Sequence, residues 1–114
     1  MKFQGLGVSK GIYEGRARWL DDPKMLHLLE QGEVLVCKTT DPDWGEAFDL
    51  AGAVVTMIGS ILCHAAIIAR EYGLPAVVNI KNIDDFDGSV MGPEDLDGAR
   101  VRVDGTTGTV EVLE

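Results

Sequence analysis

His64 is the residue in this chain whose type and placement are best suited to chemistry. It is the one strongly nucleophilic nitrogen in residues 59–78, a run that is otherwise mostly small and apolar, and it falls where a glycine-serine turn gives way to a helix. An unperturbed imidazole titrates near ~6.5, so most of it is the neutral nucleophile at pH 7. A helix start offers unpaired N–H groups and the positive end of the dipole, which favour phosphate. His64 is therefore a candidate phosphoryl acceptor, with its phosphate surrounded by Gly59, Ser60, Cys63 and Ala65.

On residue type alone, a structural histidine at a helix start is the more common case, and the neighbouring residues do not complete a catalytic set. Arg70 follows His64 by ~9 Å of helical rise and roughly 240° of rotation, so it should point toward Glu71, another element or a partner chain. Cys63 is adjacent in sequence and diverges from His64 on a helix, which excludes a thiolate-imidazole pair. No cysteine or histidine lies at zinc-ligand spacing, and we predict no metal site.

The elements that must position His64 can be predicted from periodicity. An uncharged run, residues 50–69, is about long enough to span a bilayer, but its glycines and β-branched residues favour a strand followed by a helix. Buried strands are predicted at 53–58 and 76–80, and the helix between them runs from about Cys63 to Tyr72 and ends at Gly73. This β-α-β unit carries the histidine, and its strands are parallel if they share a sheet.

The remaining elements are predicted from alternation and turn residues. Strands are expected at 11–20 and 33–38, a short helix at 24–31 capped by Asp21-Asp22-Pro23, and a short helix at about 44–50. Residues 81–97 have the composition of an exposed connection, and 99–113 that of a β-hairpin. Cys37, Trp44 and Phe48 are expected to pack in the core, and His27 to be structural. The whole chain, 1–114, is predicted to be one α/β domain.

Composition limits the classes of function. The 46% hydrophobic and 25% charged residues are typical of a globular domain, and the formal charge of −9 without a basic stripe argues against binding nucleic acid. Two cysteines in apolar segments and an N-terminus without a signal-peptide core indicate a reducing, cytoplasmic setting and no membrane attachment.

The stretch Gly59-Ser60-Ile61-Leu62-Cys63-His64-Ala65-Ala66-Ile67-Ile68-Ala69-Arg70-Glu71-Tyr72-Gly73-Leu74-Pro75-Ala76-Val77-Val78 resembles the phosphohistidine motif of the mobile, swivelling domain of phosphoenolpyruvate-utilising enzymes. The resemblance continues through Thr40-Asp41-Pro42-Asp43-Trp44 and Asp104-Gly105-Thr106-Thr107-Gly108-Thr109-Val110. It implies a single-domain swivelling β/β/α fold with a C-terminal β-hairpin, and it assigns the phosphorylated position to His64. The family usually has glycine where Ser60 stands, serine or threonine at Cys63, and often an acidic residue at Met57.

The resemblance leads us to expect a free-standing phosphohistidine carrier, a component of a phosphotransferase. Such a carrier moves a phosphoryl group from a donor, ATP or phosphoenolpyruvate, to an acceptor. The domain alone is expected to bind no cofactor. Mg²⁺ and the donor are expected on partners: an ATP-grasp-like nucleotide-binding chain and a chain that binds phosphoenolpyruvate or the acceptor. The departures at Ser60, Cys63 and Met57 leave open a non-catalytic binding or regulatory domain of the same fold, and the chain is alternatively a fragment of a large enzyme.

Overall fold

The computed structural model describes residues 2–80, 83–84 and 90–113, and eight of its strands form one sheet in the order β1-β10-β9-β3-β4-β5-β6-β2. These strands are β1 (Lys2–Gln4), β2 (Leu6–Ser9), β3 (Ile12–Trp19), β4 (Val34–Cys37), β5 (Ala53–Thr56), β6 (Ala76–Val78), β9 (Arg100–Asp104) and β10 (Thr109–Val112). The strands β3, β4, β5 and β6 are parallel neighbours, whereas β1, β10, β9 and β3 pair antiparallel.

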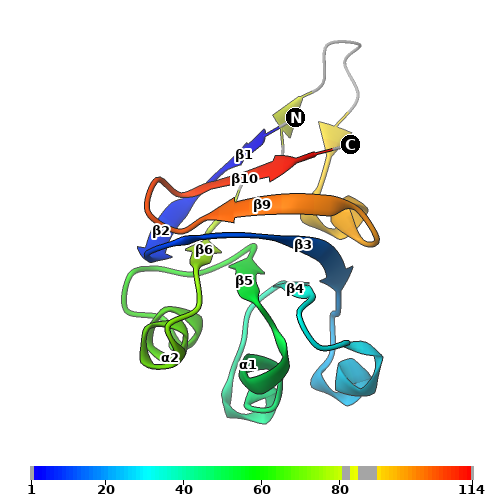
Figure 1. Cartoon of the computed structure of the whole chain (residues 1–114), viewed down its shortest axis with the longest axis vertical. Coiled ribbons are helices and arrows are strands. Elements are labelled where there is room, and N and C mark those ends of the chain that lie inside the picture. The colour runs from blue at the N-terminus through cyan, green and yellow to red at the C-terminus, as the bar shows by residue number, and fades with distance from the viewer. Residues whose placement is uncertain (1, 81–82, 85–89, 114) are drawn as a thin grey trace.

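Helices cover one side of the parallel strands, and the antiparallel strands cover the other together with one short helix, η3 (Pro93–Leu96) (Figure 1). The α-helices are α1 (Ala47–Leu50) and α2 (His64–Tyr72), and the 3₁₀ helices are η1 (Pro23–Leu28), η2 (Pro42–Trp44) and η3 (Pro93–Leu96). Successive residues of β4 alternate between two cores: Leu35 and Cys37 pack with the helices, and Val34 and Val36 pack with the antiparallel strands. This layering confirms the predicted α/β class and β/β/α fold, and it explains the continuous apolar runs of strands buried on both faces.

The unit that carries the histidine has the predicted form. β5 and β6 are parallel, with Val54 opposite Ala76 and Val55 opposite Val77, and α2 connects them. The uncharged run 50–69 is thus divided between a strand and the start of a helix. In the part of the chain that the structure describes, no helix is long and apolar enough to cross a membrane.

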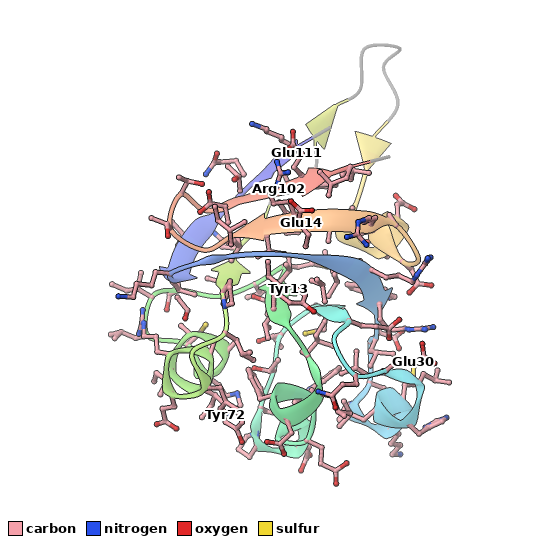
Figure 2. All side chains as sticks on the ribbon, viewed as in Figure 1. Tyr13, Glu14, Glu30, Tyr72, Arg102 and Glu111 are labelled. Atoms are coloured by element: carbon pink, nitrogen blue, oxygen red, sulfur yellow. The ribbon has the colours of Figure 1, made fainter. Side chains whose placement is uncertain are left out.

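The C-terminal hairpin is also confirmed. Val103 pairs with Val110 across β9 and β10, and both side chains are buried. On its polar side, Arg102 bonds Glu14 of β3 at 2.8 Å and Glu111 of β10 at 3.2 Å, so one guanidinium joins three neighbouring strands (Figure 2). Both carboxylates raise the pKa of Arg102, chiefly through the Glu14 hydrogen bond.

Two predicted helices are wrong in type or extent. The 24–31 helix is a 3₁₀ helix over Pro23–Leu28, capped as expected by Asp22, because Leu29 turns to an extended conformation and buries its side chain. The 44–50 helix is split into η2 and α1, since the Asp41 side chain caps a tight turn that starts at Pro42.

Strands β1 and β2 were not predicted, because they are short and interrupted by glycine. Only Gly5 separates them, yet β1 pairs with β10 and β2 pairs with β6 at the opposite edge of the sheet order. Glycines let the segment 5–9 approach the turn between β9 and β10 closely. Gly5 N–H donates to Gly108 O at 2.8 Å, and a Cβ on Gly105 would collide with the Ser9 carbonyl oxygen.

The connection predicted for residues 81–97 lies partly outside the described residues. Its described part contains the antiparallel pair β7 (Ile83–Asp84) and β8 (Val90–Met91), followed by η3. Leu96 of η3 is fully buried against the antiparallel layer, so this end of the connection belongs to the core.

Candidate functional site

His64 is the first residue of α2, as predicted. The turn before it is held by Cys63 N–H donating to Ser60 O at 3.2 Å and by Leu62 N–H donating to Ser60 Oγ at 3.3 Å. Cys63 is the N-cap in an extended conformation, and Gly73 ends the helix in the left-handed region at φ 71°. These local bonds fix where the helix begins and therefore which residue its first turn presents.

Thr40 fixes the imidazole from a different segment of the chain. Its Oγ1 lies 2.8 Å from His64 Nδ1, and Thr40 is buried. The Phe48 ring meets the imidazole edge to face, with centroids 6.0 Å apart and planes at 72°. The contact with Thr40 was not deduced from the sequence, although Thr40 begins the second segment that resembles the family. The topology explains the contact. Strands β4 and β5 are parallel neighbours, so the loop after β4, which carries Thr40, and the loop after β5, which leads to His64, leave the same edge of the sheet.

The contact with Thr40 engages one ring nitrogen, Nδ1. The His64 side chain is half-buried, and among the described residues no hydrogen bond engages Nε2. When Nδ1 carries the proton and donates it to Thr40, the lone pair of the neutral ring is on Nε2. In that tautomer the site presents an oriented nitrogen nucleophile.

The start of α2 also offers backbone hydrogen-bond donors. The first α-helical bond runs from Ile67 N–H to Cys63 O, and the Cys63 side chain makes no capping hydrogen bond. The N–H groups at the start of α2, including that of Ala65, therefore have no partner within the helix, and such groups bind phosphate oxygens.

The other residues predicted to surround a phosphate have structural contacts. Ser60 is exposed, and its hydroxyl accepts from Leu62 within the turn rather than capping the helix. Gly59 packs closely: a Cβ there would lie 3.0 Å from Cys63 Sγ and 3.0 Å from the Val78 Cβ. Gly59 is therefore needed to seat the turn on β6, and Cys63 Sγ is half-buried beside it.

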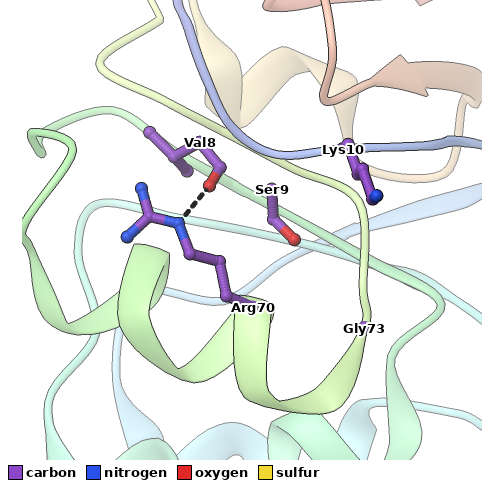
Figure 3. A pocket seen from close by; sticks show the side chains of 5 residues that line it. All are labelled: Val8, Ser9, Lys10, Arg70 and Gly73. Atoms are coloured by element: carbon purple, nitrogen blue, oxygen red, sulfur yellow. Dashed lines mark hydrogen bonds between the residues drawn. The ribbon is translucent and has the colours of Figure 1, made fainter.

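Arg70 turns away from His64, as its helical spacing predicted. Its Nε donates to Val8 O at 2.6 Å (Figure 3). One of its terminal nitrogens donates to Ile61 O at 2.9 Å. Arg70 also lines a pocket of about 400 Å³ with Val8, Ser9, Lys10 and Gly73. Its hydrogen bonds tie the turn that precedes the histidine to strand β2.

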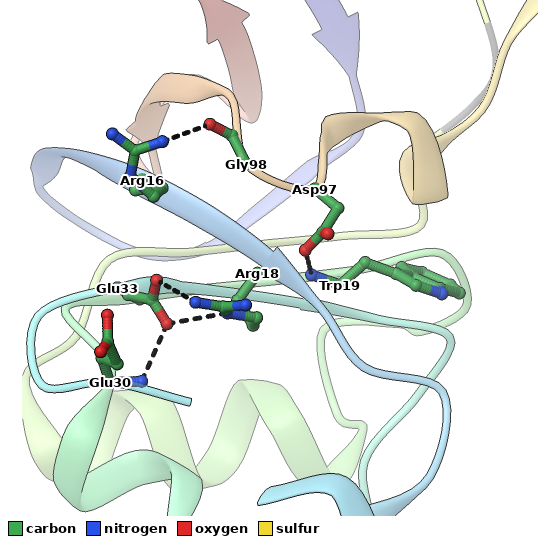
Figure 4. Close-up of polar contacts among 7 residues, drawn as sticks. All are labelled: Arg16, Arg18, Trp19, Glu30, Glu33, Asp97 and Gly98. Carbon is green, nitrogen blue, oxygen red and sulfur yellow. Dashed lines mark hydrogen bonds and ion pairs between the residues drawn. The ribbon is translucent and has the colours of Figure 1, made fainter. Parts of the chain in front are cut away.

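An ion pair between the half-buried Arg18 and the buried Glu33 supports the strand that leads to Thr40. Arg18 of β3 donates two hydrogen bonds to Glu33, both 3.0 Å, and Glu30 N–H donates a third at 2.8 Å (Figure 4). Burial opposes ionisation of Glu33, but the bonds from Arg18 and Glu30 outweigh it and lower the pKa of this carboxyl. Glu33 thus stays charged and anchors the start of β4.

The remaining candidates have the structural roles that were predicted. His27 is exposed and its Nδ1 lies 3.1 Å from Lys24 O, while Cys37 is fully buried and burial raises its pKa to about 12. Trp44 and Phe48 are both core residues. Across residues 2–80, 83–84 and 90–113, no group of three or more His, Cys, Asp or Glu side chains is arranged to hold a metal ion.

The fold and the site define a class: a three-layer β/β/α domain that presents one oriented histidine at a helix N-terminus. Residues 29–108 match the family model described as PEP-utilising enzyme, mobile domain. The chain belongs to this family, as its motif indicated.

Relatives and solved structures agree with that assignment. A rifampicin phosphotransferase from Bacillus cereus is 44% identical over 109 residues, which are 96% of this chain and 12% of that protein. A solution structure of Enzyme I is 27% identical with a TM-score of 0.57, over 75% of this chain and 32% of the other. The holo form of aconitase X from Thermococcus kodakaraensis shares the fold, with a TM-score of 0.65 and 18% identity over 100% of this chain and 99% of the other. The family and its phosphotransferase relatives support a phosphoryl-carrying domain, and the chain spans about an eighth of the relative's length.

Proposed function

We propose that this chain carries a phosphoryl group on Nε2 of His64, between a donor site that holds ATP or phosphoenolpyruvate and an acceptor site on partner chains. The observation that carries the proposal is the 2.8 Å contact between Thr40 Oγ1 and His64 Nδ1, which leaves Nε2 as the nitrogen with no hydrogen bond among the described residues. The acidic, globular chain is expected to work in the cytoplasm, and its two cysteines are free.

The transfer needs no base on this chain. The Nε2 lone pair attacks phosphorus, a nitrogen–phosphorus bond forms, and the bond from phosphorus to the leaving oxygen breaks; that oxygen departs with the nucleotide or with enolpyruvate. The ring gains positive charge as the bond forms, and the Nδ1–H···Oγ1 bond to Thr40 then becomes charge-assisted and stronger. The N–H groups at the start of α2 stabilise the transferred phosphate, and the reverse attack by an acceptor oxygen regenerates neutral His64.

The other half of each active site belongs to the partners. Phosphoryl transfer requires cations on the phosphate oxygens. This chain has no Lys or Arg from Thr39 to Ala69, the interval that contains Thr40 and His64. Mg²⁺ and basic side chains are therefore expected on an ATP-grasp-like or phosphoenolpyruvate-binding chain, and the carrier is one component of a phosphotransferase.

The two histidines of the chain provide a matched test. Wild type, His64→Ala and His27→Ala are each incubated with the rifampicin phosphotransferase of B. cereus and either ATP labelled with ³²P at its β and γ phosphates or [³²P]phosphoenolpyruvate. We expect acid-labile, alkali-stable label on wild type and His27→Ala, located at Nε2 of His64, and none on His64→Ala. Label that persists in His64→Ala, or its absence from wild type with both donors, contradicts the proposal and favours a binding domain of the same fold.

A further inference from the structure

Exposed apolar side chains gather next to His64. Four of the large hydrophobic residues that the structure shows exposed lie in the turn before α2 or in its first turn: Ile58, Ile61, Leu62 and Ile67. We call them the apolar arm. Leu62, two residues before the histidine, is 75% exposed. Single exposed hydrophobic residues are ordinary, but a group of them beside a reactive side chain is typical of a contact surface.

The backbone of the apolar arm is held by hydrogen bonds, so its side chains are presented in a defined way. Ile58 N–H donates to Lys38 O at 3.0 Å, Arg70 donates to Ile61 O at 2.9 Å, and Leu62 N–H donates to Ser60 Oγ at 3.3 Å. These bonds hold the backbone of the turn at three points, and the side chains are exposed. The exposure is therefore built into the fold.

The other segment of the site, which begins at Thr40, is rich in acidic side chains. Asp41, Asp43 and Glu46 follow Thr40, and all three are exposed; we call them the acidic arm. Asp41 caps η2, whereas Asp43 and Glu46 form no ion pair among the described residues. Residues 39–69 contain four carboxylates and no Lys or Arg, so the surface around Thr40 and His64 includes negative charge that this interval does not neutralise.

We propose that the two arms form the docking surface for the phosphoryl-donor site of a partner chain. The partner's surface would then have an apolar patch that contacts the apolar arm and cationic groups around it that face the acidic arm. This inference rests on the proposed function. A donor site must hold its polyanionic substrate with Mg²⁺, Lys or Arg, and the acidic arm is complementary to such cations. The apolar arm displaces water from around the phosphoryl group, which favours transfer over hydrolysis.

The small size of the apolar arm fits a carrier. A carrier must leave one site before it reaches the next, and transient interfaces are small and more polar than permanent ones. Four exposed apolar side chains together with three exposed carboxylates provide an orienting contact with rapid association. The acidic arm is expected to act mainly on the association rate, and the apolar arm mainly on the lifetime of the complex.

The test measures how transfer to His64 depends on carrier concentration, with the B. cereus rifampicin phosphotransferase and labelled ATP or phosphoenolpyruvate as the donor system. The apolar arm is altered by Ile61→Thr with Leu62→Thr, and the matched control is Ile12→Thr, which changes an exposed isoleucine of β3. We expect the KM for the carrier to rise at least about tenfold in the double variant and to be unchanged in the control. Equal KM values for the two would overturn the proposal.

The acidic arm is tested by Asp43→Asn with Glu46→Gln, and Asp21→Asn is its control at an exposed position outside the arm. At low ionic strength, the second-order rate of transfer should fall several-fold in the double variant, and the difference should vanish near about 0.5 M NaCl, where charges are screened. A difference that is insensitive to salt, or no difference at low salt, contradicts the electrostatic role of the acidic arm.

The two proposals fail in distinguishable ways. If wild type itself takes no label, the proposed function fails. If wild type is labelled and all variants match it, only the docking surface is refuted.

Discussion

Replacing Thr40 by valine removes the hydroxyl 2.8 Å from His64 Nδ1 and keeps a β-branched side chain of similar size in a buried position. The variant should fold, with a change in unfolding free energy within about 1 kcal/mol, because the lost hydrogen bond is the main term. Its effect on transfer should be larger, since the ring becomes cationic as phosphorus binds to Nε2. A hydrogen bond to a charged group contributes about 1.5–3 kcal/mol, so transfer should slow between about tenfold and about 100-fold.

The assay for Thr40→Val is rapid-quench labelling of His64, together with long-range ¹H–¹⁵N NMR of the imidazole. Wild type should show the Nδ1–H tautomer, and the variant should lose part of that population. Thr40→Ser keeps the hydroxyl and should transfer at close to the wild-type rate. The reasoning is refuted if folded Thr40→Val transfers as fast as wild type, or if wild-type His64 carries its proton on Nε2.

Two further predictions concern the scaffold that supports the site. Glu33→Gln should be less stable than wild type by roughly 1–2 kcal/mol at pH 7, because it loses the charged bonds with Arg18. Since the folded state lowers the pKa of Glu33, this advantage exists above the unfolded pKa and should disappear as pH falls below about 4, as chemical denaturation at several pH values will show. Gly105→Ala should lower the free energy of unfolding by about 3 kcal/mol or more, because the new Cβ would collide with the Ser9 carbonyl oxygen. In Gly45→Ala the nearest atom to the new Cβ is Pro42 O at 3.5 Å, so the free energy of unfolding should change by less than about 1 kcal/mol. Thermal unfolding of both variants measures the difference. Equal melting temperatures for the two glycine variants would contradict the close crossing.

The predictable elements were those with a local signal. Helix α2 has a turn before it, Gly73 at its end and Pro75 beyond, and β9 and β10 alternate strictly around a glycine turn. Where local signals conflict, prediction failed. Pro42 and Gly45 broke one expected helix, and the core position of Leu29 shortened another. Burial of a single leucine outweighed helical periodicity there.

The position of His64 at a helix start was predictable from the sequence, and the contacts of its ring were not. His64 was identified as the candidate nucleophile from that position and from the family motif. Its contact with Thr40 spans 24 positions in the chain, and it exists because two parallel strands bring their following loops together. Gly59 was expected near the phosphate, and its close packing was not predicted: a Cβ there would lie 3.0 Å from Cys63 Sγ and from the Val78 Cβ.

The placement of the first two strands has a consequence for how the domain folds. Phe3 of β1 pairs with Val110 of β10, almost the whole length of the described sequence away, whereas β2 pairs with β6. The pairing of β1 with β10 therefore closes a very long loop, and the entropy of that closure opposes the contact. Because contacts between residues far apart in sequence form slowly, we expect the pairing of β1 to be among the late steps of folding.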